Sequence, residues 1–381
     1  MPGPPDPQKP GGPFSRTLEQ EDLTRMRARH RFFPSPFLVV LGIALGFSVP
    51  ADACTTFCLR DEGRILFGKN YDWHLGDGLL VVNQRGLART AGVDGDKPAS
   101  WLSRYGSVTF NQYGRDFPSG GMNEAGLVIE LMWLEGVRYP APDQRPAVDV
   151  LQWIQYNLDS HATVAEVLAA DQKVRIKGEV PLHYLVADRK GQVATVEFLN
   201  GRLVAHTGKN LPVAALTNST YRQSESFRRQ ASQRGTVPEG QGSLERFARA
   251  ADRVAKFEGR KGDAVAYAFE TLDQVAQGPF TKWSIVYEID RARIHFRTES
   301  HRPVRTLSLA GLDFECGHPV RVLPLDKKVE GDVARHLVPY TREINDGLVH
   351  ASFSKTSFLA SVPDAEIQRV ITYPEAAVCR R

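Results

Sequence analysis

The stretch ADACTTFCLRDEGRILFGKNYDW, residues 51–73, decides the fold, because it places a cysteine directly between a cleavage motif and a pair of short apolar strands. The Ala-Asp-Ala that precedes the cysteine has the small-x-small form that signal peptidase accepts. A basic segment at 25–31 and an apolar run at 36–49 come before it, as in an export signal. We therefore predict that residues 1–53, an N-terminal extension and signal peptide, are removed. Cys54 then becomes the first residue of an exported chain, periplasmic or extracellular.

Three roles are open to Cys54: a disulfide partner, a lipid anchor or the nucleophile of an enzyme. The apolar run before it is too short to span a bilayer comfortably, so no stable membrane insertion is expected after processing. A lipoprotein signal would have Leu in place of Ala51 and a small or hydroxyl residue in place of Asp52. Residues 51 and 52 thus fit a lipoprotein signal poorly. If Cys54 is nevertheless lipidated, the alternative to an enzyme is a lipid-anchored, non-catalytic binding module of the same fold. The translation start stays open between Met1 and Met26.

The charge and cysteine content exclude several classes of protein. The chain has 48 Lys and Arg against 44 Asp and Glu over 381 residues, a net charge of +4, so no nucleic-acid partner is indicated. Its four cysteines, Cys54, Cys58, Cys316 and Cys379, are too few for a disulfide scaffold. If Cys54 is free, the others allow at most one bridge, and no second Cys or His pair completes a zinc site. We expect neither a metal nor a cofactor.

Beyond residue 53 the hydrophobic pattern predicts an α+β chain in one domain, 54–381, because no linker or repeat interrupts it. A hairpin is predicted for 55–68 around the polar turn Asp61-Glu62-Gly63. The order of elements favours sheets covered by paired helices over parallel βαβ winding. Further strands are predicted at 79–82, 107–110, 127–134, 182–187, 193–198, 203–205, 213–216, 283–289, 292–297 and 306–309, and helices at 150–158, 163–168, 244–255 and 265–275.

A cysteine at the start of a chain carries a thiol and an α-amine on one residue. The amine has an ordinary pKa of about 8, so it can act as the base, and no catalytic histidine is required. A pair with His74 or His183 is disfavoured because nothing local supports it. The site still needs a carboxylate to orient the amine, a cation for the thiolate and donors for an oxyanion. Polar clusters beside predicted strand and helix ends offer such groups at 68–73, 121–127, 216–219 and 244–247.

The order of these clusters resembles the choloylglycine hydrolase family, which includes penicillin V acylases and bile salt hydrolases. The matching motifs are CTT from Cys54, FGKNYD at 67–72, GMNEAGL at 121–127, LTNS at 216–219 and Arg-Phe at 246–247. The resemblance implies a four-layer αββα sandwich of the N-terminal-nucleophile hydrolase type. It also implies an amidase that cleaves a non-peptide C–N bond in linear amides through an acyl-thioester on the cysteine.

The resemblance also assigns roles to three residues. Asp72 would hold the α-amine, Asn218 would donate to the oxyanion, and Arg246 would stabilise the thiolate or polarise the site. Each has a plainer interpretation. Asp72 could pair with Lys69 or a neighbouring surface base, Asn218 could be a turn residue or a glycosylation acceptor, and Arg246 could be an exposed helix residue.

Two positions depart from the family pattern. Lys69 stands where many members have Arg, which keeps the charge but loses the planar fork. It is retained as a candidate catalytic residue, with a solvated strand-end charge as the alternative. Trp133 stands where members place an Asn or Tyr of the oxyanion hole, and an indole can donate but not accept. Either Asn218 and a backbone N–H form the hole while Trp133 shapes an apolar pocket, or Trp133 contributes to the hole.

The predicted substrate is a small acyl amide. Leu75, Met132 and Trp133 are predicted to bind its acyl group, because apolar side chains gather in these segments. Penicillin V-like phenoxyacetyl amides, fatty acyl amides including acyl-homoserine lactones, and conjugated bile acids all stay open as substrates. Members of the family are often tetrameric, so the resemblance is compatible with a homotetramer.

Overall fold

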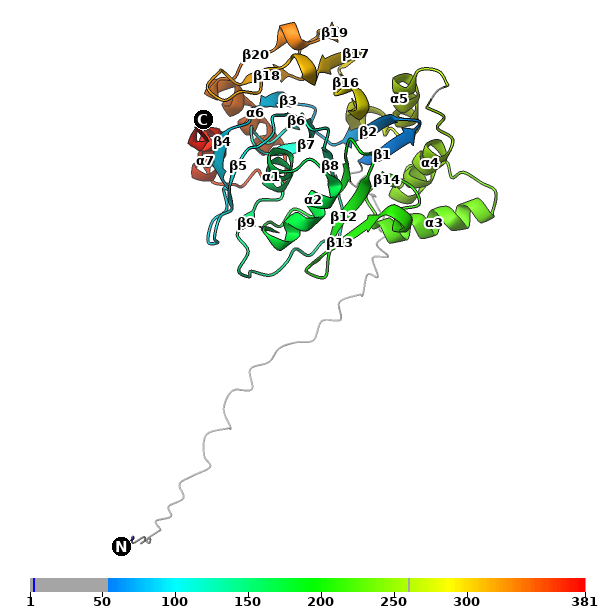
Figure 1. Cartoon of the computed structure of the whole chain (residues 1–381), viewed down its shortest axis with the longest axis horizontal. Coiled ribbons are helices and arrows are strands. Elements are labelled where there is room, and N and C mark those ends of the chain that lie inside the picture. The colour runs from blue at the N-terminus through cyan, green and yellow to red at the C-terminus, as the bar shows by residue number, and fades with distance from the viewer. Residues whose placement is uncertain (1–2, 4–53, 260, 381) are drawn as a thin grey trace, which may run out of the picture. The chain divides into compact units, whose positions relative to one another are not determined.

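Two large β-sheets lie face to face at the centre of the protein, and a computed structural model describes residues 3, 54–259 and 261–380 (Figure 1). One sheet has seven strands in the order β14-β1-β2-β15-β16-β17-β19. Its strands are β1 (Thr55–Asp61), β2 (Arg64–Asp72), β14 (Ala215–Leu216), β15 (Thr281–Glu288), β16 (Arg293–Thr298), β17 (His301–Ser308) and β19 (Gly331–Asp332).

The second sheet has nine strands in the order β13-β12-β11-β8-β7-β6-β3-β18-β20. They are β3 (Leu79–Asn83), β6 (Ser107–Asn111), β7 (Pro118–Asn123), β8 (Val128–Trp133), β11 (Leu182–Ala187), β12 (Val193–Leu199), β13 (Arg202–Thr207), β18 (Arg321–Pro324) and β20 (Val338–Pro339). Two small sheets flank it, made of β9 (Ala147–Val148) with β10 (Arg175–Ile176), and of β4 (Leu87–Thr90), β5 (Ser100–Leu102) and β21 (Val378–Cys379).

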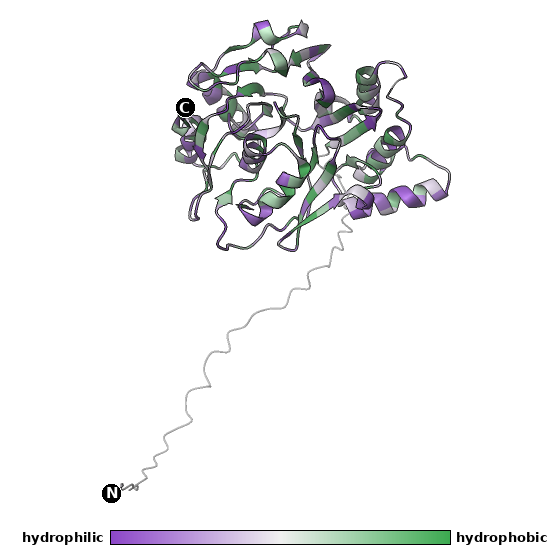
Figure 2. Cartoon of the chain, in the orientation of Figure 1, coloured by the Kyte–Doolittle hydropathy of each residue, from purple (hydrophilic) through white to green (hydrophobic). Residues whose placement is uncertain are grey.

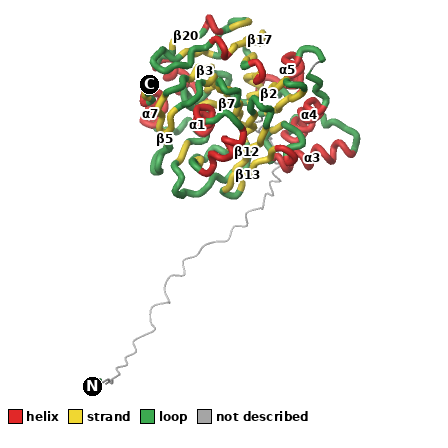
Figure 3. Tube along the Cα trace, viewed as in Figure 1, coloured by secondary structure: helices red, strands yellow, loops and turns green. Residues whose placement is uncertain are grey.

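Helices cover the outer faces of both sheets, which gives four layers (Figure 3). On the seven-stranded sheet, α4 (Ser243–Ala255) packs on β1 and β14, and α5 (Ala264–Gln274) packs on β2 and β15. On the nine-stranded sheet, α1 (Gln152–Ser160) packs on β7 and β8, and α2 (Val164–Ala169) packs on β12. The remaining helices are α3 (Tyr221–Gln233), α6 (Arg342–Lys355) and α7 (Asp364–Thr372). The predicted αββα arrangement is confirmed.

The two sheets are held together by a core of aromatic side chains. The ring of Phe110 on β6 lies 5.4 Å from that of Phe296 and 6.4 Å from those of Trp283 and Tyr287, measured between centroids. Edge-on and tilted contacts of this kind add to the burial energy of large rings. These ring contacts join β6 of the nine-stranded sheet to β15 and β16 of the seven-stranded sheet.

The first hairpin positions the cysteine. Glu62 and Gly63 form its two-residue turn, with φ of 48° and 85°, the left-handed backbone that a type I′ turn requires. The register pairs Thr55 at the start of β1 with Asn70 near the end of β2. Extended by one residue, this register puts Cys54 opposite Tyr71, and its thiol donates to the backbone carbonyl of the next residue, Asp72, which ends β2.

Most predicted elements are observed within a few residues of their expected bounds. The capping box of α2 is present, with the Thr163 hydroxyl accepting from the Glu166 N–H. The Asn200-Gly201 turn has the positive φ angles expected of it, 54° and 76°. One strand was predicted too long, since β14 covers only Ala215–Leu216 of the expected 213–216.

Twelve strands and α-helices were not predicted: β4, β5, β7, β9, β10, β18, β19, β20, β21, α3, α6 and α7. The β7 sequence contains Gly120 and Gly121, which weaken a strand pattern, yet side chains at these positions would collide with Glu130 and with the backbone of β6. Helix α3 is largely polar along its length, as Figure 2 shows, so it lacks a clear apolar periodicity.

The remaining cysteines follow the sequence-based expectation of at most one bridge. Cys316 and Cys379 form a disulfide, while Cys54 and Cys58 are buried thiols. None of the helices in residues 54–259 and 261–380 is long and apolar enough to cross a membrane. The predicted extension and signal peptide, 1–53, lies outside the described residues except for Gly3.

Candidate active site

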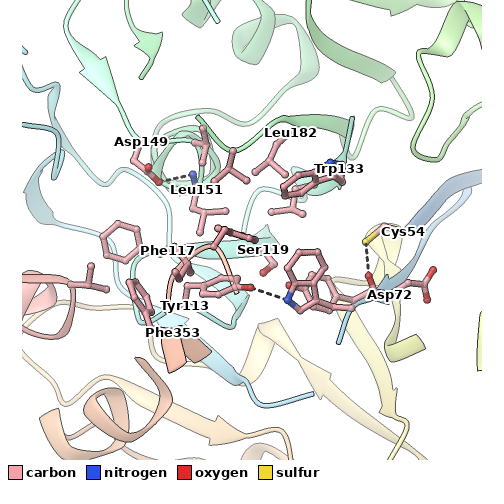
Figure 4. Close-up of a pocket in the computed structure, with 18 residues that line it drawn as sticks. Cys54, Asp72, Tyr113, Phe117, Ser119, Trp133, Asp149, Leu151, Leu182 and Phe353 are labelled. Carbon is pink, nitrogen blue, oxygen red and sulfur yellow. Dashed lines mark hydrogen bonds between the residues drawn. The ribbon is translucent and has the colours of Figure 1, made fainter. Parts of the chain in front are cut away.

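Cys54 lies at the wall of a pocket that encloses about 950 Å³ of empty space, its open mouth included. Its side chain is 5% exposed, and its thiol donates to the backbone carbonyl of Asp72 at 3.9 Å. Figure 4 shows Cys54 and Asp72 at one end of the lining side chains and Asp149 and Phe353 at the other. Most of the side chains that line the pocket are apolar. The complete lining consists of Cys54, Tyr71, Asp72, Trp73, Tyr113, Phe117, Ser119, Leu131, Trp133, Asp149, Val150, Leu151, Val180, Leu182, Phe353, Phe358, Leu359 and Val370.

The Cys54 thiol is protonated at neutral pH. Burial raises its pKa above the ordinary value, the Lys69 ammonium opposes that rise, and the Asp72 carboxylate adds to it. A protonated thiol is a weak nucleophile, so the site needs a base. In the full chain the Cys54 nitrogen belongs to a peptide bond and is not basic. Cleavage before Cys54 would turn it into an amine.

Asp72 is a buried carboxylate held by neighbouring side chains. The Thr281 hydroxyl donates to its Oδ1, and the Gln277 amide donates to its Oδ2 at 3.3 Å. Burial raises the pKa of Asp72 to about 6, although the charge of Arg246 and these two hydrogen bonds favour the ionised form. The carboxylate is therefore largely ionised at neutral pH and protonated in mild acid.

Arg246 connects the cysteine to the asparagine through a fully buried guanidinium. Its Nη1 donates to the Cys54 carbonyl at 2.8 Å and to the Thr55 hydroxyl at 2.6 Å. Its Nη2 donates to Asn218 Oδ1 at 3.0 Å, and its Nε donates to the Gln241 carbonyl at 3.1 Å. The planar fork thus fixes both residues at once, which an ammonium could not do. The interpretation of Arg246 as an exposed helix residue is wrong.

Asn218 follows β14 and lies between the Arg246 guanidinium and the Trp133 backbone, outside the residues that line the pocket. Its Oδ1 accepts from Arg246, and its Nδ2 donates to the Trp133 carbonyl at 2.9 Å. Its backbone N–H donates to the Ser243 hydroxyl at 2.9 Å, which ties the residue to the start of α4. An amide nitrogen carries two hydrogens, so Nδ2 keeps one more to donate to a substrate oxygen.

Lys69 is fully buried between the sheets, so the interpretation of it as a solvated strand-end charge is wrong. It lies on β2, which has strands on both sides, and faces the other sheet, where its ammonium donates to the Leu131 carbonyl and lies 3.8 Å from Glu130. The Tyr287 hydroxyl donates to the same carboxylate. Burial raises the pKa of Glu130 to about 7, against the opposing charge of Lys69.

The three residues predicted to bind the acyl group are placed differently from one another. Trp133 lines the pocket, but its indole N–H donates to Glu135 Oε1 at 2.6 Å. The neighbouring Met132 is fully buried on the opposite face of β8, because side chains alternate along a strand. Leu75 lies in the main core. The structure places neither Met132 nor Leu75 in the lining of the pocket.

Several residues of the site were missed by the sequence analysis. Thr281 and Gln277, which hold the Asp72 carboxylate, come from the loop and strand that follow α5. Phe353 enters the pocket from the unpredicted helix α6, and Phe358 enters from the loop between α6 and α7. Thr281 begins β15, two residues before the strand predicted at 283–289, so the sequence analysis singled out neither it nor Gln277. In the described part of the chain, no group of three or more His, Cys, Asp or Glu could hold a metal ion.

The four-layer fold is that of the N-terminal-nucleophile hydrolases, and Cys54 lies at the wall of its pocket. Residues 54–254 match the model of the linear amide C-N hydrolases, choloylglycine hydrolase family. The chain therefore belongs to this family of amide hydrolases, and the resemblance drawn from the sequence motifs is confirmed.

Individual relatives agree with the family. The chain is 30% identical over 204 residues to a penicillin V acylase of Pectobacterium atrosepticum, a match that covers 48% of this chain. The match spans only about half of that relative, 53% of its length. The structure of penicillin V acylase from Agrobacterium tumefaciens is similar with a TM-score of 0.68 and 25% identity, over 76% of this chain and 98% of that one. A conjugated bile acid hydrolase of Clostridium perfringens shares the fold at 17% identity and a TM-score of 0.62, over 73% of this chain and 98% of that one.

Proposed function

We propose that the mature protein hydrolyses linear acyl amides with Cys54 as an N-terminal nucleophile. The observation that carries the proposal is the convergence on one cysteine of a carboxylate, a guanidinium and an amide donor, at the wall of an apolar pocket. No residue in this arrangement replaces the missing base, whereas an α-amine on Cys54 would supply it.

The reaction would run in two stages. The α-amine accepts the thiol proton, Sγ attacks the amide carbonyl, and the tetrahedral oxyanion accepts a hydrogen bond from Asn218 Nδ2. The protonated amine then gives its proton to the leaving nitrogen, which departs and leaves an acyl-thioester on Cys54. Water, deprotonated by the same amine, attacks the thioester and releases the acid and the thiol. Asp72 holds the amine throughout, and Lys69 and Arg246 favour the thiolate.

The pocket favours an apolar acyl group. Aromatic and aliphatic side chains form most of its lining, and the few polar ones besides the reacting groups include Ser119 and Asp149. Phenoxyacetyl amides, as in the penicillin V of the relatives' names, and fatty acyl amides fit this description. Conjugated bile acids stay as a further candidate. A homotetramer stays an expectation from the family.

Export and processing are part of the proposal, and one experiment tests them together with the activity. The protein is produced with its full N-terminus, recovered from the exported fraction, sequenced from its first residue and weighed intact. It is then assayed against phenoxyacetyl, straight-chain acyl and bile acid amides. We expect Cys54 as first residue, no diacylglyceryl mass, and hydrolysis. A lipid mass on Cys54 would support the binding module, and an unmodified Cys54 terminus without hydrolysis of any amide would contradict the mechanism.

The pH dependence of kcat/KM should show two protonations. The α-amine must be neutral, so kcat/KM should fall by about tenfold per pH unit below about pH 8. Asp72 must be ionised to hold the amine, and its pKa is raised to about 6. Below that pH its protonation should steepen the fall to about a hundredfold per unit. The Asp72→Asn protein should be slower and keep only the shallower slope, and a steep acid limb in that variant would contradict the role of Asp72.

Trp133 and Asn218 should differ sharply as oxyanion donors. The indole N–H of Trp133 is engaged by Glu135, so Trp133→Phe should change kcat by less than about fivefold. Asn218→Ala removes the donor and should lower kcat by about a hundredfold or more. Single-turnover acylation rates of both variants check the difference. A larger loss in Trp133→Phe than in Asn218→Ala would move the oxyanion hole to the indole.

A further inference from the structure

The far wall of the pocket comes from a part of the chain beyond the family match, which ends at residue 254. Four apolar residues of α6, α7 and the loop between them line the same pocket as Cys54. We call them the C-terminal wall: Phe353, Phe358, Leu359 and Val370. In Figure 4, Phe353 lies at the opposite end of the pocket from Cys54. The wall therefore faces the part of an acyl group that is remote from the reacting carbonyl.

The C-terminal wall has a small core of its own. Val349, Phe353, Ile367 and Ile371 form a buried cluster separate from the main core, with Leu359 and Val370 packed against it. Gly114, with φ of 113°, lets the neighbouring loop approach Val349 closely. A change at the pocket side of the wall should consequently leave the two central sheets intact.

Both ends of this segment are attached to sheets. Before α6, β20 pairs with β18 of the nine-stranded sheet. After α7, β21 pairs with β4, and the disulfide between Cys316 and Cys379 joins β21 to the loop before β18. Between these attachments, Lys355 forms an ion pair with Asp77 at 3.0 Å. The segment that carries the wall is therefore joined at both ends to the sheets of the main body.

Phe358 is the most informative residue of the wall. It is a large apolar side chain that is 47% exposed although it lines a pocket, and its ring lies 6.1 Å from that of Trp133. Trp133 in turn accepts a hydrogen bond from Asn218 through its carbonyl. The acyl chain of a thioester on Cys54 would extend from the carbonyl along Trp133 and cover the exposed face of Phe358. This contact removes apolar area from water.

We propose that Phe358, with Leu359 beside it, sets the length of the acyl chain that the pocket accepts. This inference rests on the proposed acyl amide hydrolysis and adds a specificity-determining segment to it. A smaller side chain at 358 lengthens the preferred chain, and a larger one shortens it. One methylene in an apolar pocket changes kcat/KM by roughly tenfold or more, so the shift is measurable.

The test uses Phe358→Ala and Phe358→Trp with p-nitroanilides of straight-chain acids from about four to about twelve carbons. We expect the ratio of kcat/KM for long over short chains to rise about tenfold in the alanine variant and to fall about tenfold in the tryptophan variant. Leu102→Ala is the matched control, because Leu102 is 48% exposed and lies outside the pocket. Its ratio should stay at that of the parent.

The same variants in a Cys54→Ala background separate this inference from the proposed function. Binding of the corresponding N-acyl glycines, followed by quenching of tryptophan fluorescence, does not require hydrolysis. A shift of chain-length preference in opposite directions for alanine and tryptophan supports the C-terminal wall even if no amide is cleaved. Equal losses for all chain lengths, or no shift in either variant, would overturn it.

Discussion

We expect the Cys54→Ser protein to lose at least about ten-thousand-fold in kcat/KM for every acyl amide that the parent hydrolyses. A serine hydroxyl ionises far less readily than a thiol, and the α-amine that a serine at position 54 would keep is too weak a base to make up the difference. The nearest carboxylate, Asp72, is engaged by Thr281 and Gln277. The measurement compares kcat/KM of the two proteins after sequencing shows residue 54 at the N-terminus of both.

Cys58→Ser is the matched control for this prediction. Cys58 is the other buried thiol, and burial raises its pKa to about 12, so it is inert at neutral pH. It does not line the pocket. We expect the variant to keep its activity within about threefold of the parent, with some loss of stability from a buried hydroxyl. Hydrolysis by Cys54→Ser within tenfold of the parent would remove the proposed nucleophile.

The part of the site that lies on the first hairpin could be predicted because its geometry is local. A two-residue turn at Glu62 and Gly63 fixes the register of β1 and β2, and this register brings the end of β2, where Asp72 lies, next to Cys54. Asn218 and Arg246 are far from this hairpin along the chain. No local pattern brings them to it: their segments were noted as polar clusters, but only the family resemblance assigned the two residues their roles.

The environment of Lys69 shows where an interpretation from neighbouring residues fails. A lysine near a strand end is usually solvated, but β2 is an interior strand whose inner face meets a second sheet. Its partner Glu130 lies on β8 and faces Lys69 only because the two sheets pack together. The buried pair depends on tertiary packing, which the one-dimensional pattern of β2 does not contain.

The acyl pocket was the least predictable part of the site. Met132 was expected in its lining and Phe358 was not, yet the structure reverses the two. Strand alternation turns Met132 away while the adjacent Trp133 faces the pocket. Phe358 enters from a loop more than two hundred residues further along the chain, between two helices without a strong sequence signal.

Arg246→Leu should lower kcat/KM by about a thousandfold and destabilise the fold by about 3 kcal/mol, measured by urea unfolding. The guanidinium orients the Cys54 carbonyl, the Thr55 hydroxyl and Asn218 Oδ1, and its loss leaves these buried acceptors without their donor. Arg246→Lys should recover much of the stability but little of the rate, because an ammonium cannot reach Cys54 and Asn218 with the same planar geometry.

The matched control is Arg249→Gln. Arg249 lies on the same helix but donates only to the backbone carbonyls of Pro238, Gly240 and Gln274, so the variant should retain activity. Full recovery of the rate by lysine would show that Arg246 acts through its charge alone and would contradict the positioning role that its fork implies.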